Sequence, residues 1–317
     1  MTVSFLACDI IIVKLRRLCY NTRVEAVSPQ LQYVSRLWAH GLDNYADSQG
    51  RLAIFGGTME NSKISWTDNS WNPVTGCTQV SPGCDNCYAK RIAEQKRGPA
   101  FPKGFDITLR PHKLRDPLKW KEPKLIFVNS MSDLFHRDIP QDYLSQVWAT
   151  MCQADWHTYQ VLTKRAHRMA HLIKTLNLPT PPHIWLGVSA ENQQMADSRI
   201  PPLLTIPAPV RFISAEPLLG PIDLTPYLSG LAWVIDGGES GSGRRPAEMD
   251  WFRSLRDQCD KSGVAYYHKQ GNAHMSGRDV ELDGVIRHAY PDTGGHAEAA
   301  RRAVAQTETP KQFALAG

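Results

Sequence analysis

Three of the chain's seven cysteines lie within one short stretch, TGCTQVSPGCDNCYAK. They are Cys77, Cys84 and Cys87, and their spacing is C-x6-C-x2-C. The glycine and proline residues between them predict a loop. Because the sequence contains no convincing export signal, we expect a cytoplasmic protein. In a reducing compartment, clustered cysteines bind metals or take part in redox chemistry more often than they form disulfides.

Three thiols are compatible with several kinds of metal site. A structural zinc site normally has four protein ligands, yet no fourth cysteine is near and His112 is the closest downstream histidine. A catalytic zinc ion keeps three protein ligands, although an all-thiolate set is unusual for it. An iron–sulfur cluster prefers thiolates, and three of them leave one iron of a four-iron cluster open to another ligand. Three unliganded cysteines are the remaining alternative.

The composition sets wide bounds on function. The 317 residues suit one large domain or two small ones, and 42% hydrophobic residues are typical of a globular protein. The formal charge of +5 permits contact with nucleic acid without requiring it. No apolar run is long enough to span a bilayer. The early run FLACDIIIVKL is short and interrupted by Asp9, which makes it a poor secretory signal.

The chain divides into three regions of different character. Residues 1–58 have no clear periodicity, and we interpret them as an extension that precedes a natural start at Met59. A genuine small helical appendage around LQYVSRLWAHGLDNY is the alternative. Residues 59–290 are expected to form the folded domain. Residues 291–317 are mostly polar or small, which predicts a disordered tail.

Short apolar runs alternate with helical patterns from residue 64 onward. We expect strands at 124–130, 157–163, 183–189, 210–216, 231–238 and 264–270. Apolar residues at helical spacing predict helices at 141–155, 165–176 and 250–263. Strands that are apolar nearly throughout suit a parallel sheet buried on both faces. About six strand–helix units predict an α/β fold, and specifically a partial parallel (β/α) barrel.

Polar residues follow these expected strands at their carboxyl ends, where the active sites of parallel barrels lie. The series comprises Ser130, Ser132, Asp133, Lys164, Arg165, Ser189, Glu191, Asn192, Ser214, Glu216, Asp236, Gly237, Gly238, Glu239, Ser240, His268, Lys269 and Gln270. A single polar strand end is explained by helix capping or by solvation. Polar ends on all of the expected strands predict a polar functional cavity.

The cysteine motif, placed near the first strand of such a barrel, resembles that of the radical S-adenosylmethionine (radical SAM) enzymes. The resemblance implies that three thiolates bind a 4Fe-4S cluster whose fourth iron is chelated by SAM. It further implies that reductive cleavage of SAM gives a 5′-deoxyadenosyl radical. Most of these enzymes space the cysteines C-x3-C-x2-C, so the first gap is longer here. A loop that wraps around a cluster tolerates this difference.

The resemblance extends from about Lys63 to Pro291, through KISWTDNSWNPVTGCTQVSPGCDNCYA, VNSMSDLFH, VLTKR, WLGVSAEN, RFISAEPLLGPID, VIDGGESG and RDQCDKSGVAYYHKQ. Together these segments are similar to a phage-associated family of three-Cys-motif proteins (the phage protein Gp37/Gp68 type), which is similar in kind to radical SAM enzymes. In that superfamily a GGE sequence that contacts the SAM amino group follows an early strand. Here GGE follows a late strand, and SDLF takes the early position.

The resemblance and the residue chemistry suggest three groups of site residues. The expected cluster ligands are Cys77, Cys84 and Cys87. The expected cofactor-binding residues are Tyr88, Ser132, Asp133, Lys164, Ser189, Glu191, Asn192 and Glu216, most of which offer acceptors for SAM. The expected substrate-binding residues are Arg165, Gly237, Gly238, Glu239, Arg244, Arg245 and Lys269, a set that suits an anion or phosphate. Trp66, Trp71, Tyr88 and Trp120 are candidates for stacking on bases, with core or lid positions as the alternative.

Two classes of function fit these features. The main hypothesis is an iron–sulfur, radical SAM-like enzyme that modifies or repairs a nucleic acid or nucleotide. Its electron would come from a donor such as flavodoxin or ferredoxin. The alternative is a non-catalytic protein, either a zinc-stabilised nucleic-acid-binding protein or a phage accessory protein. The substrate and the type of reaction stay open at this point.

Overall fold

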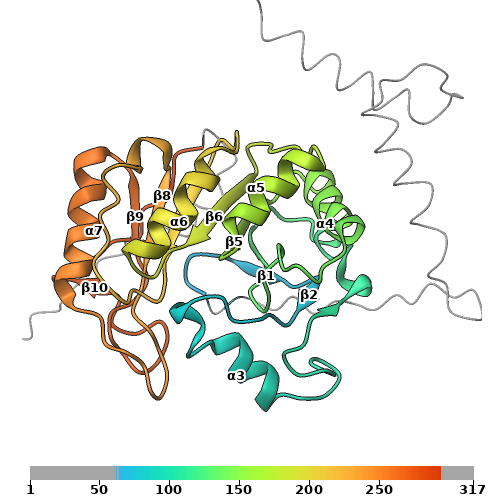
Figure 1. The fold of residues 1–317 in the computed structure, drawn as a ribbon, viewed down its shortest axis with the longest axis horizontal. Helices are drawn as coiled ribbons and strands as arrows, with labels where there is room; N and C mark the ends of the chain where they lie inside the picture. The colour runs from blue at the N-terminus through green and yellow to red at the C-terminus, as the bar shows by residue number, and fades with distance from the viewer. Residues whose placement is uncertain (1–61, 63, 294–317) are drawn as a thin grey trace, which may run out of the picture. The chain divides into compact units, whose positions relative to one another are not determined.

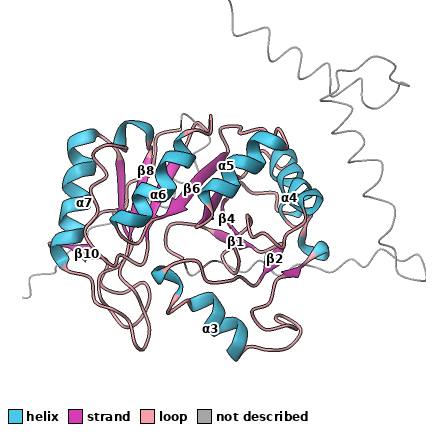
Figure 2. Cartoon of the chain, viewed as in Figure 1, coloured by secondary structure: helices cyan, strands magenta, loops and turns pink. Residues whose placement is uncertain are grey.

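A curved sheet of seven parallel strands forms the centre of the fold (Figures 1 and 2). In order across the sheet these are β1 (Asn69–Trp71), β4 (Leu125–Val128), β5 (Thr158–Thr163), β6 (Ile184–Ser189), β7 (Arg211–Ala215), β8 (Trp233–Asp236) and β9 (Ala265–His268). Among the described strands, β1 and β9 form the two edges and do not pair with each other. The sheet is therefore an open, partial (β/α) barrel, which confirms the predicted fold class.

The structure is a computed structural model that describes residues 62 and 64–293. These residues fall within one compact unit, Gly57–Gly317. The expected extension at 1–58 lies outside the described residues, as does the expected tail from residue 294 onward. Both stay predictions.

Four helices pack on the outer face of the sheet (Figure 2). They are α4 (Gln141–Gln153), α5 (Ala166–Thr175), α6 (Gln193–Leu204) and α7 (Met249–Ser262). The predicted helices correspond to α4, α5 and α7. Helix α6 was not predicted, because the two prolines within it indicate a loop. The helix forms because Asn192 caps its start and both prolines lie in its last turn, so the two backbone N–H donors that they lack leave the hydrogen bonds of the earlier turns intact.

Two layers of apolar side chains hold the sheet in place. The outer layer packs the sheet against the helices. The inner layer, here called the inner aromatic cluster, consists of Trp66, Phe127, Trp185, Phe212, Trp233 and Tyr267 with smaller apolar neighbours. Each fully buried aromatic side chain contributes roughly 1.5–3 kcal/mol of hydrophobic stabilisation. Trp66 and Trp71, which were candidates for stacking on bases, are buried, so both occupy the alternative position in the core.

The positions of the inner aromatic cluster along the strands show which polar strand ends face the concave side of the sheet. Side chains alternate between the two faces of a strand. Residues two or four positions beyond Trp185, Phe212 and Tyr267 therefore lie on the same inner face, nearer the carboxyl ends of the strands. The aromatic side chains thus fill one end of the barrel and leave polar residues at the other.

Two short antiparallel pairs complete the described strands. They are β2 (Val74–Thr75) with β3 (Thr108–Leu109), and β10 (Glu281–Leu282) with β11 (Val285–Ile286). The pairing of β2 with β3 matters for function because the three cysteines follow β2 directly. In residues 62 and 64–293 we find no helix with the length and apolar character of a membrane span.

Candidate functional site

Residues 76–87, here called the cysteine loop, connect β2 to the short helix α3 (Tyr88–Gln95). The loop begins at Gly76, whose φ of +89° and close approach to Asp106 leave no room for a side chain. A single 3₁₀ turn at Pro82–Cys84 follows, and Cys87 is the N-cap residue of α3. All three cysteine residues of the loop are half-buried, so their thiols remain accessible to a ligand.

The Cys77 thiol lies beside a cation. Its Sγ accepts a hydrogen bond of 3.5 Å from Arg165 Nη1. Burial raises the pKa of the Cys77 thiol, although the positive charge of Arg165 opposes this change. A depression of about 450 Å³ next to the thiol is lined by Cys77, Thr78, Phe105, Asp106, Ile107, Leu109, Asp138 and Pro140. In the described ranges no three His, Cys, Asp or Glu side chains already surround one point as metal ligands would.

Asp133 and Arg165 support the first part of the cysteine loop from the ends of β4 and β5. The Asp133 carboxylate pairs with Arg165 Nη1 at 2.8 Å and accepts hydrogen bonds from Thr163 Oγ1 at 2.7 Å and from the backbone N–H groups of Lys164 and Phe135. Arg165 Nη2 then donates to the carbonyl oxygen of Thr78 at 3.0 Å. The buried carboxylate therefore fixes the arginine that contacts the loop.

Glu191 supports the middle of the cysteine loop from the end of β6. Its side chain is fully buried, and its carboxylate pairs with Arg199 Nη1 at 2.8 Å. The same carboxylate accepts a hydrogen bond from the backbone N–H of Gly83 at 3.2 Å. Burial pushes the pKa of Glu191 upward, but Arg199, the Ser81 hydroxyl and Lys164 outweigh burial, and the pKa is lowered overall. Glu191 is therefore an ionised anchor for the loop.

The loop that follows β8 supports the last part of the cysteine loop. Glu239 is buried and accepts hydrogen bonds from Asn86 Nδ2 at 2.8 Å and from Arg245 Nη2 at 2.6 Å. Arg245 in turn donates to the Pro82 carbonyl at 2.9 Å and to Asp85 at 3.0 Å. Burial opposes ionisation of Glu239, yet its hydrogen bonds with Arg245 and Asn86 leave its pKa lowered. Arg245 thus contacts the cysteine loop directly.

A second set of predicted site residues lies on the inner face of the sheet. Ser189, Ser214, Glu216 and Lys269 share this face with the inner aromatic cluster. Lys269 and Glu216 form an ion pair, and Ser214 Oγ lies 3.5 Å from Glu216 Oε1. Lys164 occupies the same face on β5, and its charge acts on the pKa of Glu191. These residues form a polar layer with both charge signs above the aromatic side chains.

The remaining predicted site residues make mainly internal contacts. Tyr88 OH donates to the Ser130 carbonyl at 2.6 Å, and Ser132 Oγ donates to the Val74 carbonyl at 2.9 Å. Asn192 caps α6. The backbone N–H groups of Gly237 and Gly238 donate to the carbonyls of Ala215 and Gln270. Arg244 is exposed, and its Nε donates to the Asn272 carbonyl at 2.8 Å.

Two residues of this region were not predicted from the sequence. Asn129 ends the β4 run with a φ of +62°, and neither polar atom of its buried side chain has a hydrogen-bond partner in the described structure. Because Asn129 directly precedes the polar residues Ser130 and Ser132, its position in the sequence could have identified it as a further polar residue at a strand end. Arg199, the partner of Glu191, lies within α6. Because Pro201 and Pro202 obscure the helical pattern of α6, no pattern in the sequence indicated a role for Arg199.

Two polar strand ends face the helices. Asp236 Oδ1 lies 2.7 Å from His268 Nδ1, and Tyr266 OH donates to Asp236 Oδ2 at 2.5 Å. Tyr266 also donates to the Phe252 carbonyl of α7. Asp236 and His268 are fully buried under α7, so this pair joins sheet to helix rather than lining the concave side.

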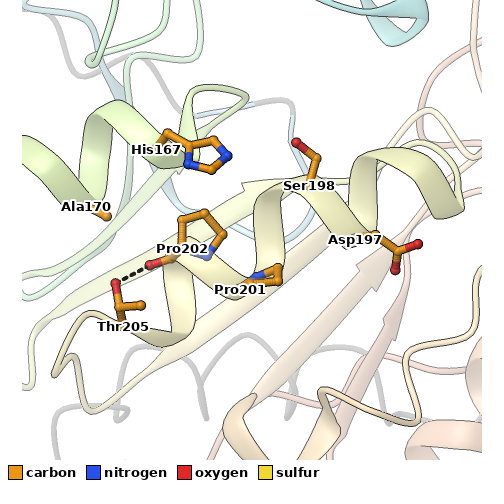
Figure 3. A pocket seen from close by; sticks show the side chains of 7 residues that line it. All are labelled: His167, Ala170, Asp197, Ser198, Pro201, Pro202 and Thr205. Carbon is orange, nitrogen blue, oxygen red and sulfur yellow. Dashed lines mark hydrogen bonds between the residues drawn. The ribbon is translucent and has the colours of Figure 1, made fainter.

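A separate depression lies between α5 and α6 (Figure 3). It is lined by His167, Ala170, Asp197, Ser198, Pro201, Pro202 and Thr205. Thr205 Oγ1 donates to the Pro202 carbonyl at 2.7 Å at one end of it. None of the predicted site residues lines this depression, so it belongs to the outer helical layer.

The contact between Gly83 and Glu191 leads to a first prediction. A Cβ atom at Gly83 would lie 2.9 Å from Glu191 Cδ, and the carboxylate cannot yield easily because it pairs with Arg199. We expect Gly83→Ala to lower the free energy of unfolding by about 1–3 kcal/mol in urea denaturation. Gly220→Ala is the control, because its Cβ would make an ordinary 3.6 Å contact. Equal losses in both variants would contradict the proposed steric cause.

Comparison with known families identifies the chain. The family described as "Protein of unknown function (DUF5131)" matches residues 61–307, which is most of the sequence and all of the site described above. The chain belongs to the DUF5131 family. No curated protein matches it. The matched region therefore includes both the cysteine loop and the parallel sheet, but the family description gives no activity for them.

Two solved structures are similar to this DUF5131 member. One is a spore photoproduct lyase complexed with dinucleoside spore photoproduct, with 13% sequence identity, a TM-score of 0.42 and coverage of 64% of each chain. The other is a mutant of spore photoproduct lyase with bound AdoMet and dinucleoside spore photoproduct, with 12% identity and a TM-score of 0.38. The second match covers 68% of this chain and 59% of the other. The chain thus spans less than two thirds of either lyase.

Proposed function

We propose that this protein is an iron–sulfur enzyme of the radical SAM kind, which acts on a nucleic acid or nucleotide. Its cysteine loop would hold a 4Fe-4S cluster, and SAM would bind on the concave side of the sheet. Within its family we further propose that it is of the phage-associated three-Cys type. The observation that carries the proposal is the position of three half-buried thiols on one supported loop at the carboxyl ends of the parallel strands.

The residues present suit such a cluster in their chemistry. Thiolates are the usual protein ligands of iron–sulfur clusters. The three thiols belong to one loop, and each retains partial exposure. The side chain of Asn129 is buried at the end of β4 with both polar atoms unpaired in the described structure, and a buried amide of this kind suits a polar ligand. We therefore add Asn129 to the proposed cofactor-binding residues.

Cys77, Cys84 and Cys87 would hold the cluster, which together with SAM supplies one-electron cleavage and a 5′-deoxyadenosyl radical. Asp133, Arg165, Glu191, Glu239 and Arg245 would act as positioning residues, because their contacts hold the loop that carries the thiols.

The inner-face residues would contact the small molecules. Ser189, Ser214 and Glu216 offer acceptors for the ammonium and hydroxyl groups of SAM, while Lys164 and Lys269 offer cations for carboxylate or phosphate. Arg244 is exposed on the loop after β8 and would meet an anionic substrate. The inner aromatic cluster closes the far end of the barrel, so ligands would enter from the side of the cysteine loop.

The test is anaerobic reconstitution of the full chain with iron and sulfide, followed by metal analysis and by addition of SAM and dithionite. We expect iron in the amount of one four-iron cluster per chain, and 5′-deoxyadenosine as the product. Cys84→Ala should lose both. Cys152→Ala is the matched control and should retain both, because Cys152 lies on α4 and outside the loop. Equal iron loss in the two variants would contradict the assignment of the loop.

Zinc binding is the second candidate function, because three thiolates also suit that ion. Purification of the protein with one zinc per chain, without visible absorbance and without formation of 5′-deoxyadenosine, would favour a non-catalytic binding protein. In that case Cys84→Ala would lose zinc, and Cys152→Ala would keep it.

A further inference from the structure

The positive charge of the chain is concentrated in one segment. Residues 88–124, here called the basic segment, contain eleven Lys and Arg but only four Asp and Glu, a net charge of +7. The whole chain carries +5, so the other 280 residues together carry −2. This segment therefore carries more positive charge than the chain as a whole.

The first part of the basic segment presents its charges to solvent. Its exposed cations are Lys90, Arg91, Lys96, Arg97 and Lys103. In the described part of the chain none of these five forms an ion pair, whereas 12 ion pairs between Lys or Arg and Asp or Glu occur elsewhere in it. Glu94 is the only acidic residue between positions 88 and 103, so the like charges are not balanced and repel one another. This arrangement suits binding of an external anion with several charges.

The apolar side of α3 is already covered. Ala89 and Ala93 are buried against the body of the protein, and Ile92 is half-buried. A helix that lies in a membrane surface needs a free apolar face as well as basic residues. Because α3 has no such face to offer, its charges favour a hydrophilic polyanion over a lipid surface.

The basic segment adjoins the candidate active site. Helix α3 begins directly after Cys87, and a Cβ atom at Gly241 in the loop after β8 would lie 2.4 Å from Arg91 Nη1. Exposed Arg244 belongs to the same loop. Figure 1 shows α3 and the loops that follow β8 and β9 on the same side of the sheet. An anion bound to α3 would therefore extend toward the cysteine loop.

We propose that the basic segment binds the phosphate backbone of a nucleic acid strand and thereby directs the polymer, rather than a free nucleotide, to the cysteine loop. This inference rests on the proposed function and supplies its substrate class. Helix α3 alone is about 12 Å long, and phosphates recur about every 3.4 Å along a strand of a duplex. Several phosphates can thus contact the five cations at once, whereas a mononucleotide reaches few of them.

The test is the fluorescence anisotropy of a labelled single-stranded oligonucleotide, titrated with the full chain at several salt concentrations. We expect binding that weakens as salt rises, with weak competition from the free mononucleotide. Lys90→Glu/Lys96→Glu should weaken binding about tenfold or more at low salt and reduce the slope of log K against log salt by about 1.4, for two lost phosphate contacts.

A matched variant separates a local site from net charge. Lys174→Glu/Lys261→Glu makes the same change in charge at two exposed lysines on α5 and α7 and should leave the affinity nearly unchanged. Equal weakening in both variants, no binding by the wild type, or mononucleotide competition as strong as that of the polymer would overturn the proposal. Binding to phosphatidylserine vesicles but not to the oligonucleotide would overturn it in favour of a membrane surface.

The binding measurement is independent of the cluster. The titration needs neither iron nor SAM, so it can succeed even where reconstitution yields no 5′-deoxyadenosine. Conversely, the wild type could form 5′-deoxyadenosine while the Lys90→Glu/Lys96→Glu variant binds the oligonucleotide normally. That result would support the proposed function and contradict only the role of the basic segment in binding the polymer.

Discussion

Asp133→Ala is expected to lower the free energy of unfolding by about 3–5 kcal/mol, because it leaves the partly buried charge of Arg165 without its partner. The side chains of Asp133 and Arg165 are only 8% and 13% exposed. The substitution also removes the acceptor for Thr163 Oγ1 and for two backbone N–H groups. Urea denaturation followed by tryptophan fluorescence measures the loss.

Asp250→Ala is the control for this experiment. Asp250 also pairs with an arginine, Arg253, but its side chain is 83% exposed and Arg253 keeps a second partner in Asp283. Exposed pairs of this kind contribute about 0–1 kcal/mol. Similar losses in Asp133→Ala and Asp250→Ala would mean that the support of the cysteine loop by β4 and β5 is energetically unimportant.

Glu191→Gln is expected to cost about 3 kcal/mol or more at neutral pH, because Arg199 then lacks a counter-charge in a fully buried position. The cost should depend on pH. Since the folded-state pKa of Glu191 is lowered, its ionised form stabilises the protein above the ordinary pKa of about 4.3. That contribution is lost as pH falls below this value and through the folded-state pKa.

The difference in stability between wild type and Glu191→Gln should therefore be largest near neutral pH and shrink in acid. Urea midpoints measured from neutral pH down to the acid limb test this directly. Glu281→Gln provides the control, because Glu281 is exposed and forms no ion pair in the described structure. The lowered pKa of Glu239 means that part of the acid sensitivity should persist in Glu191→Gln. A pH-independent difference would contradict an ionised Glu191.

The sequence predicted the sheet better than it predicted the site. Apolar runs rich in β-branched and aromatic residues marked six strands, because strands buried on both faces have a distinctive composition. Strand β1 was missed, since three residues that include Asn69 and Ser70 carry too little apolar signal. Helix α6 was missed because Pro201 and Pro202 were interpreted as a break.

The site was predicted as a set of polar strand ends, but not as a set of contacts. Glu191 bonds to Gly83 across 108 positions of the chain, and Asn86 bonds to Glu239 across 153. Local spacing contains no information about pairs so far apart. The acceptors expected to bind a cofactor therefore include two, Asp133 and Glu191, whose contacts hold the cysteine loop. Asn129, whose side-chain amide is unpaired in the described structure, was not predicted as a site residue because it lies within the expected strand at 124–130.

An open sheet lacks the ring of hydrogen bonds that fixes the diameter of a closed barrel. In this protein, the covalent segment that leaves the β1 edge contacts residues at the ends of β5, β6 and β8 in turn. The twelve residues of the cysteine loop therefore tie the β1 edge to the ends of three strands with which β1 does not pair. Because these hydrogen bonds hold the backbone that carries the three thiols, the relative placement of the thiols is set by strand ends that lie far apart in the sequence.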